Sequence, residues 1–232
     1  MKIVFLSDIH GNKYALSSFI AEMKLSKPDN IIFCGDIFGY YYYQNEIIDS
    51  FKENKINMLL GNHDQYFLDI LDGNADTDDL INKYGNSYNN IGSRITSENV
   101  ELLKSLSPSC DFVIDNYRIG VFHGSPYNPL DGRIYPYTEI TETKLYEDYD
   151  FVILGHTHHK MVKKIKSTVL LNPGSIGQQR DGKGASYLEL DTITGEYEFK
   201  IIDFDVEGLI EDIDYYDQGN LKLKEVLFRK SL

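Results

Sequence analysis

The 232-residue sequence contains no tryptophan, two cysteines, six prolines and no long hydrophobic run. Two cysteines, Cys34 and Cys110, cannot build a disulfide framework, and Cys34 lies in an apolar run typical of a buried free thiol. The longest early apolar run, residues 3–6, is too short for a signal peptide or a membrane span. We therefore expect a soluble cytoplasmic protein without a membrane partner.

Positive charge is also scarce, because 23 Lys and Arg residues face 36 Asp and Glu residues, for a formal net charge of −13. Such a chain does not hold long nucleic acid or an anionic membrane by bulk charge, since both are polyanions. The 42% hydrophobic and 25% charged residues match an ordinary globular protein. We expect one domain over residues 1–232, with no long nucleic acid as partner; the composition does not indicate an oligomeric state.

Short apolar runs alternate with amphipathic stretches in the first half of the chain. This pattern predicts a sheet covered by helices on both faces. The expected strands are 2–6, 31–34 and 56–60, and the expected helices are 12–24 and 44–54.

The pattern changes after these elements. Residues 64–106 are mostly helical in pattern, and residues from about 206 to 230 are expected to form a C-terminal helical segment. Between them the sequence favours paired strands at 112–114, 117–122, 151–154, 161–165, 168–171, 185–191 and 196–204. The fold class is therefore α/β at the start and more antiparallel later, which is an α+β arrangement.

Polar residues that can bind metal follow five of the expected strands. Because the carboxyl ends of strands in α/β sheets converge on one crevice, these residues should lie close together. Each has an ordinary alternative: Asp8 could cap a helix, Asp36 and Asn62 could occupy turns, and His123 could be a core histidine. These alternatives require five unrelated motifs to follow five successive strands by chance. A single metal centre explains all five positions at once. The candidates are Asp8, His10, Asp36, Asn62, His63, Asp64, His123, His156 and His158.

The donor types in this set are nitrogen and oxygen, without thiolate. They suit Mn²⁺ first, and also Fe, Zn²⁺ or Ni²⁺, rather than a structural zinc finger or an all-oxygen calcium site. About seven of these nine candidates are expected to be metal ligands. Seven ligands are too many for one ion and about right for two ions that share a carboxylate. Two cations roughly 3.5–4 Å apart polarise a phosphoryl group and lower the pKa of a bridging water.

The ordered set of motifs from Asp8 to about Arg180 resembles the calcineurin-like metallophosphoesterase superfamily. The stretches 122–126, 172–178 and 180–182 are similar to its small bacterial and archaeal phosphodiesterase-like branch. Gly39, three residues after Asp36, differs from the aspartate of phosphoprotein phosphatases and from the tyrosine ligand of purple acid phosphatases. The resemblance implies a four-layer αββα sandwich of two mixed sheets, with the site at the loop edge of both sheets.

The resemblance also implies a role for each site residue. His63 matches the family's non-ligand histidine, which serves the leaving oxygen, and Asp64 matches the residue that orients it. His159 matches no family position, and we expect it at the rim. One metal would take Asp8, His10 and His158, the second would take Asn62, His123 and His156, and Asp36 would bridge them.

These residues predict hydrolysis of a small phosphate ester, with a phosphodiester such as a nucleotide derivative as the expected substrate, through attack by a metal-held hydroxide. The alternative is a catalytically silent scaffold of the same fold that binds protein partners. Tyr40, Arg133 and Arg180 are candidate substrate contacts, with Lys160 as a further cation. The run Tyr40–Tyr43 could stack on a base, but for most of its members hydrophobic cover is the favoured interpretation.

Overall fold

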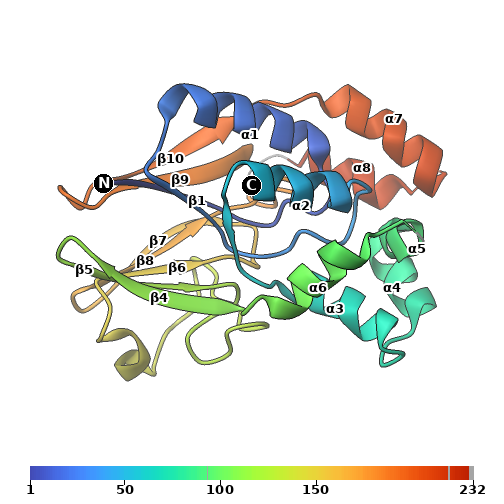
Figure 1. Ribbon diagram of the computed structural model, residues 1–232. Coiled ribbons are helices and arrows are strands. Elements are labelled where there is room, and N and C mark those ends of the chain that lie inside the picture. The colour runs from blue at the N-terminus through green and yellow to red at the C-terminus, as the bar shows by residue number, and fades with distance from the viewer. Residues whose placement is uncertain (93, 219, 230–232) are drawn as a thin grey trace.

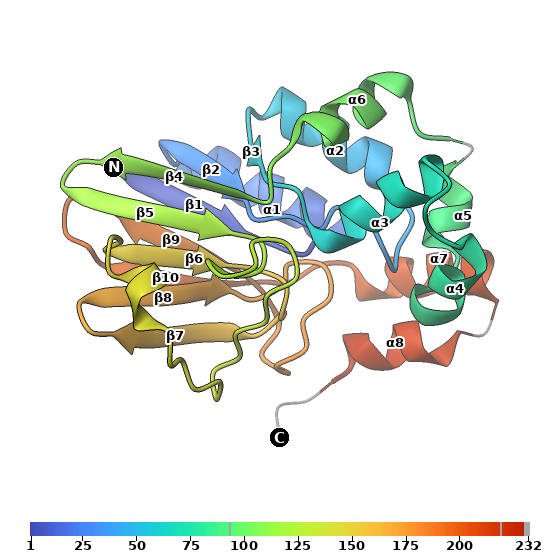
Figure 2. The same cartoon turned by 90° about the horizontal axis from the view of Figure 1, so that it is seen from below.

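The computed structural model describes residues 1–92, 94–218 and 220–229, and in this part of the chain two five-stranded mixed sheets pack face to face (Figures 1 and 2). This confirms the expected sandwich of two sheets. The first sheet has the order β10 (Tyr197–Ile202), β9 (Ala185–Asp191), β1 (Lys2–Leu6), β2 (Asn30–Phe33) and β3 (Asn57–Met58). The second has the order β4 (Ser109–Ile114), β5 (Tyr117–Phe122), β6 (Phe151–Leu154), β8 (Thr168–Pro173) and β7 (Lys160–Ile165).

Three adjacent strands in each sheet are parallel, which directs their following loops to one end of the molecule. β1, β2 and β3 run parallel in the first sheet, and β5, β6 and β8 run parallel in the second. β9 pairs antiparallel with both β1 and β10, while β4 and β7 are antiparallel edges. Figure 2 shows the loop end on the right.

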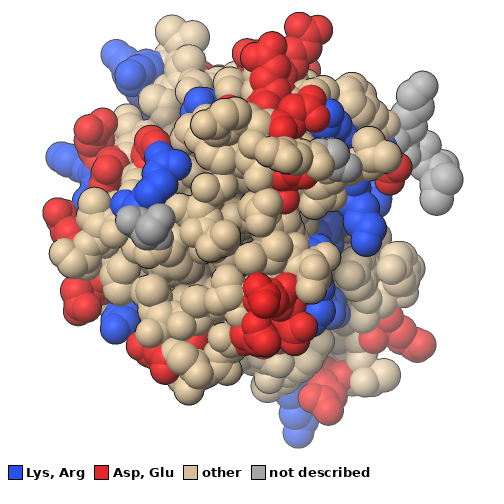
Figure 3. Space-filling view, turned by 90° about the vertical axis from the view of Figure 1, so that its right-hand side faces the viewer, with Lys and Arg blue, Asp and Glu red and all other residues tan. Residues whose placement is uncertain are grey.

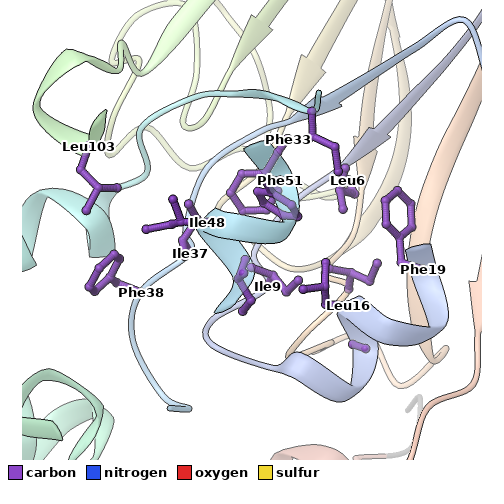
Figure 4. Packing of buried hydrophobic residues seen from close by; sticks show 14 of the residues in the cluster. Leu6, Ile9, Leu16, Phe19, Phe33, Ile37, Phe38, Ile48, Phe51 and Leu103 are labelled. Atoms are coloured by element: carbon purple, nitrogen blue, oxygen red, sulfur yellow. The ribbon is translucent and has the colours of Figure 1, made fainter. Parts of the chain in front are cut away.

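Helices cover one face of the first sheet. α1 (Lys13–Ser26) and α2 (Gln44–Glu53) pack there, and Phe33 lies against Phe51 of α2 with ring centroids 4.9 Å apart (Figure 4). The opposite face meets the second sheet, where Ile3 and Phe5 join one buried cluster with Val121. The expectation of helices on both faces is therefore wrong for this sheet. A strand buried by a sheet needs the same apolar residues as one buried by a helix.

The outer face of the second sheet is covered more thinly. Residues 123–150 cross it as a long loop with one 3₁₀ turn, η1 (Thr143–Tyr146), among the described residues. Ile134 and Tyr146 of this segment pack on Val152 and Leu170. The fourth layer of the sandwich is thus mainly a loop, a few of whose apolar side chains pack on the sheet.

The remaining helices gather at the loop end (Figure 1). The expected helical region 64–106 forms α3 (Asn62–Leu71), α4 (Thr77–Tyr84), α5 (Ser87–Gly92) and α6 (Ser97–Ser105). The expected C-terminal helical segment forms α7 (Val206–Asp217) and α8 (Leu221–Leu227), and its last residue, 230, lies outside the described residues. Within the described ranges, no helix has the length and apolar character to cross a membrane.

Candidate active site

Loops from both sheets bring the predicted metal ligands into two overlapping groups. In the first group, Asp8, His10, Asp36 and His158 place one donor atom each within 4.8 Å of one another. The second group joins Asp36 to His123 and His156 under the same limit. Asn62 belongs beside the second group, because its Oδ1 lies 3.0 Å from Nε2 of His123. Asp36 is common to both groups, as a bridging ligand would be.

The carboxylates of the site have buried oxygens that lack a hydrogen-bond partner among the described residues. These atoms are Oδ1 of Asp8 and Oδ2 of Asp36. Nε2 of His158 lies 3.3 Å from the first, and Nε2 of His123 lies 3.5 Å from the second. A buried carboxylate oxygen without a partner is strongly unfavourable, and a cation among these donors satisfies it. The residues present therefore fit a metal centre.

Backbone carbonyls orient three of the site imidazoles. Nδ1 of His10 lies 2.6 Å from the oxygen of Phe38, and Nδ1 of His158 lies 2.6 Å from that of Gln178. Nδ1 of His123 lies 2.8 Å from the oxygen of Cys34. A proton held on Nδ1 leaves the lone pair of Nε2 toward the carboxylates, which is the usual arrangement of metal-binding histidines.

Burial keeps most of these rings neutral. It lowers the pKa of His10 to about 4 and that of His156 to about 3, and it holds the pKa of His158 well below its usual value. His123 differs: burial opposes its charge, but the carboxylate of Asp36 raises its pKa to about 9. Burial likewise opposes ionisation of Asp36, but His123 and the other imidazoles hold its pKa well below the usual range. Neutral imidazole is the form that binds a cation.

Five of the seven expected ligands have a left-handed backbone conformation. The φ angles are +56° at Asp8, +49° at His10, +70° at Asp36, +65° at His156 and +57° at His158. For a residue with a side chain this conformation costs about 1 kcal/mol or more. Such strain persists only where the surrounding structure imposes it, and it is concentrated here at the donor loops.

His63 lies beside the two groups, on the first turn of α3. Its ring centroid is 5.0 Å from that of His10, and its Nδ1 lies 2.6 Å from the hydroxyl of Tyr88 in α5. Gly39 makes room for this ring: its φ is +85°, and a Cβ there would overlap Nδ1 of His63. Burial lowers the pKa of His63 well below its usual value.

Asp64 does not have the position that the resemblance implied. Its carboxylate accepts the backbone N–H groups of Gly61 at 2.8 Å, Asp36 at 3.1 Å, Ile37 at 2.8 Å and Phe38 at 2.9 Å. Asp64 is in the first turn of α3, so its carboxylate faces the amides at the start of that helix and the adjacent loop. It holds the loop of Asp36, and the contact to the His63 ring belongs to Tyr88 instead. Sequence reasoning missed Tyr88, which lies in a helical segment without a motif.

A family model described as the calcineurin-like phosphoesterase superfamily domain matches residues 1–195 of the chain. The chain belongs to this superfamily. It is accordingly a phosphoesterase, a hydrolase that acts on phosphoric ester bonds. The phosphoesterase is 28% identical to an uncharacterized protein of Methanocaldococcus jannaschii, and the match covers 91% of each chain.

Solved structures show the same fold. A hypothetical protein from Pyrococcus horikoshii has a TM-score of 0.82 at 21% identity, with 99% of each chain covered. A metallophosphoesterase from Sphaerobacter thermophilus has a TM-score of 0.75 at 22% identity, with 98% of each chain covered. Both matches include the C-terminal part of the phosphoesterase, because they cover nearly its whole length.

The three expected substrate contacts flank the metal-binding groups. The ring of Tyr40 lies 4.7 Å from that of His10, and Arg180 donates from Nη2 to the Tyr40 hydroxyl at 2.6 Å. On the other side, Arg133 donates from Nε to Nε2 of His156 at 2.9 Å. Lys160 is turned to Asp181, with 3.4 Å between its Nζ and a carboxylate oxygen.

The remaining aromatic and imidazole candidates have structural contacts. Tyr41 and Tyr42 are buried, and the hydroxyls of Tyr42 and Tyr43 donate to Asp217 and Asp212 of α7. The hydrophobic-cover interpretation therefore fits them, although they cover α7 and α8 rather than the following helix α2. His159 is half-buried, and its ring packs edge-on against Tyr135, as expected for a residue at the rim.

Proposed function

We propose that this phosphoesterase uses two divalent metal ions, Mn²⁺ foremost, to hydrolyse a small phosphodiester such as a nucleotide derivative. The observation that carries the proposal is the pair of donor groups that share Asp36. One group alone would leave the donors of the other without a cation. Fe, Zn²⁺ and Ni²⁺ are compatible with the same nitrogen and oxygen donors.

The ligands divide between the two ions as the two groups do. Asp8, His10 and His158 would hold one ion, Asn62, His123 and His156 would hold the other, and Asp36 would contact both. Ions bound there would polarise the phosphoryl oxygens and lower the pKa of a nearby water molecule. The buried carboxylate oxygens of Asp8 and Asp36 support this division.

His63 would serve the departing oxygen of the ester. Burial raises the pKa of Tyr88 well above its usual value, so its hydroxyl keeps its proton and can donate it to Nδ1 of His63. Donation to Nδ1 places the ring proton of neutral His63 on Nε2. From Nε2 the ring can stabilise negative charge as the ester bond breaks.

Tyr88→Phe is therefore expected to lower kcat by about 10- to 100-fold, the usual loss when the partner that orients a functional histidine is removed. Metal content and KM should stay close to the wild type, because Tyr88 contacts neither donor group. Steady-state kinetics and elemental analysis check this result. Tyr84→Phe is the matched control, since the Tyr84 ring packs edge-on to His63 with centroids 4.5 Å apart. An equal loss in both variants would contradict a specific role of the Tyr88 hydroxyl.

Hydrolysis of bis-p-nitrophenyl phosphate tests the proposed function. We expect turnover with Mn²⁺, its loss with EDTA and its recovery when Mn²⁺ is restored, together with two bound ions per chain by elemental analysis. A comparison with p-nitrophenyl phosphate separates diesterase from monoesterase activity. No hydrolysis of either ester with Mn²⁺, Fe²⁺, Zn²⁺ or Ni²⁺ would reject the proposal in favour of the protein-binding scaffold.

A further inference from the structure

A basic pocket lies next to the candidate active site, between α4 and α8. Its volume is about 540 Å³, within the range of small-molecule sites. Four cationic side chains line it: Lys83 of α4, Arg180 of the loop after β8, Lys222 of α8 and Arg229 just beyond α8. The lining residues include no aspartate or glutamate among the described part of the chain.

This concentration of positive charge contrasts with the rest of the molecule, whose formal net charge is −13. Figure 3 shows Lys and Arg side chains gathered in a recess on the right-hand half of this face. Lys83, Arg180 and Lys222 take part in none of the ion pairs formed by the described residues. Like charges that face one pocket without counter-charges repel one another, so a bound anion would stabilise the arrangement.

The pocket adjoins the metal-binding groups through Tyr40 and Gln178. Tyr40 lines the pocket and also lies 4.7 Å from the ring of His10, measured between centroids. Gln178 lines it too, and its backbone oxygen accepts from Nδ1 of His158. Arg180 reaches between the two regions, where it donates to the Tyr40 hydroxyl. Tyr40, Gln178 and Arg180 therefore form a boundary that the metal donors and the pocket share, which places the cations of the pocket next to an ester held at those donors.

We infer that this pocket binds a second anionic group of the substrate, so that the preferred ester carries at least one phosphate beyond the one attacked. This inference rests on the proposed function, because it assigns the substrate class of the same site. Ammonium and guanidinium groups are the side chains that bind phosphate most strongly. Lys222 and Arg229 lie beyond residue 195, where the match to the family model ends, so part of this recognition comes from outside the matched region.

Binding of inorganic tripolyphosphate to the metal-free protein tests the pocket without any catalytic step. The chain is stripped of metal, dialysed free of chelator and titrated calorimetrically at low and at 0.5 M salt. We expect measurable binding that weakens with salt, and an affinity at least about tenfold lower in the double variant Lys83→Ala, Lys222→Ala. The control is Lys24→Ala, Lys144→Ala, which changes the net charge equally at exposed positions on α1 and η1. Absence of binding, or equal weakening in both double variants, overturns the inference.

Turnover with Mn²⁺ separates this inference from the proposed function. The ratio of kcat/KM for a dinucleoside polyphosphate or a sugar bisphosphate to that for bis-p-nitrophenyl phosphate should fall at least tenfold in the pocket variant, and stay constant in the control. The two phosphorylated substrates distinguish a polyphosphate chain from two separate phosphates. Turnover of bis-p-nitrophenyl phosphate with an unchanged ratio rejects the pocket assignment alone. Failure to hydrolyse any ester rejects both proposals.

Discussion

Asp36→Asn should lose most of the bound metal and at least about 10³-fold of the hydrolytic rate, which corresponds to several kcal/mol of transition-state stabilisation. Asp36 is the residue that both donor groups contain, and its buried Oδ2 has no hydrogen-bond partner in the described part of the chain. The substitution preserves the local structure, because asparagine keeps Oδ1, which accepts the backbone N–H of His63 at 2.8 Å. Only the oxygen that lies near His10 and His123 is replaced, by an amide nitrogen that cannot bind a cation.

Elemental analysis after gel filtration and bis-p-nitrophenyl phosphate turnover measure both effects of Asp36→Asn. His158→Ala and Asn62→Ala are the comparison variants, because each removes a residue placed at one of the two donor groups. We expect each to lose less metal and activity than Asp36→Asn. A circular dichroism melt confirms that all three variants are folded. Metal content and turnover equal to the wild type in Asp36→Asn would refute the shared-ligand role.

His63→Ala has the second-largest expected effect, a loss of about 10²- to 10⁴-fold in kcat with both ions retained. The imidazole lies beside the donor groups rather than within either of them, so its removal should spare the metal. It would remove the group that serves the leaving oxygen. The loss should be smaller for esters with good leaving groups such as p-nitrophenolate, because their departure needs less help from a proton donor.

The control for this variant is His159→Ala, since His159 lies at the rim against Tyr135. It should keep wild-type turnover and metal content. A parallel series of esters with poorer leaving groups separates leaving-group assistance from a general loss of structure. If His63→Ala loses metal in proportion to activity, His63 is a metal ligand and not the group that serves the leaving oxygen.

The sequence indicated the donor loops because chemistry and local structure coincide there. Each candidate ligand lies within four residues after the end of a short apolar run, and the parallel strands carry these loops to one end of the sandwich. The fold class and the phosphoesterase family are confirmed. Ligand counting indicated that two ions would share one carboxylate, and the family resemblance implied that this carboxylate is Asp36. The left-handed backbone at five donors could not be expected, since aspartate and histidine do not require it.

Other features depend on contacts between distant segments that no local pattern encodes. Tyr88 contacts His63 across 25 residues, and nothing in the helical pattern of its segment distinguishes it from the neighbouring tyrosines. Lys83 and Lys222 meet at one pocket because α4 and α8 are neighbours at the loop end. The strand β3 is also shorter than the expected strand 56–60. After Leu59 the chain leaves the sheet, because the N–H of Leu60 donates to the backbone oxygen of Ser107 and not to β2.

The topology of the first sheet has a consequence for biosynthesis. β1 leaves the ribosome before the other strands of its sheet, but one of its two neighbours is β9, which starts at residue 185. Until β9 emerges, one edge of β1 stays unpaired, and its apolar faces await the second sheet. His158 also follows Asp8 by 150 positions, so the donor set is completed only when most of the chain has been synthesised. We therefore expect the full donor set to bind metal only after residue 158 has emerged, and N-terminal fragments released by premature termination should aggregate rather than capture ions.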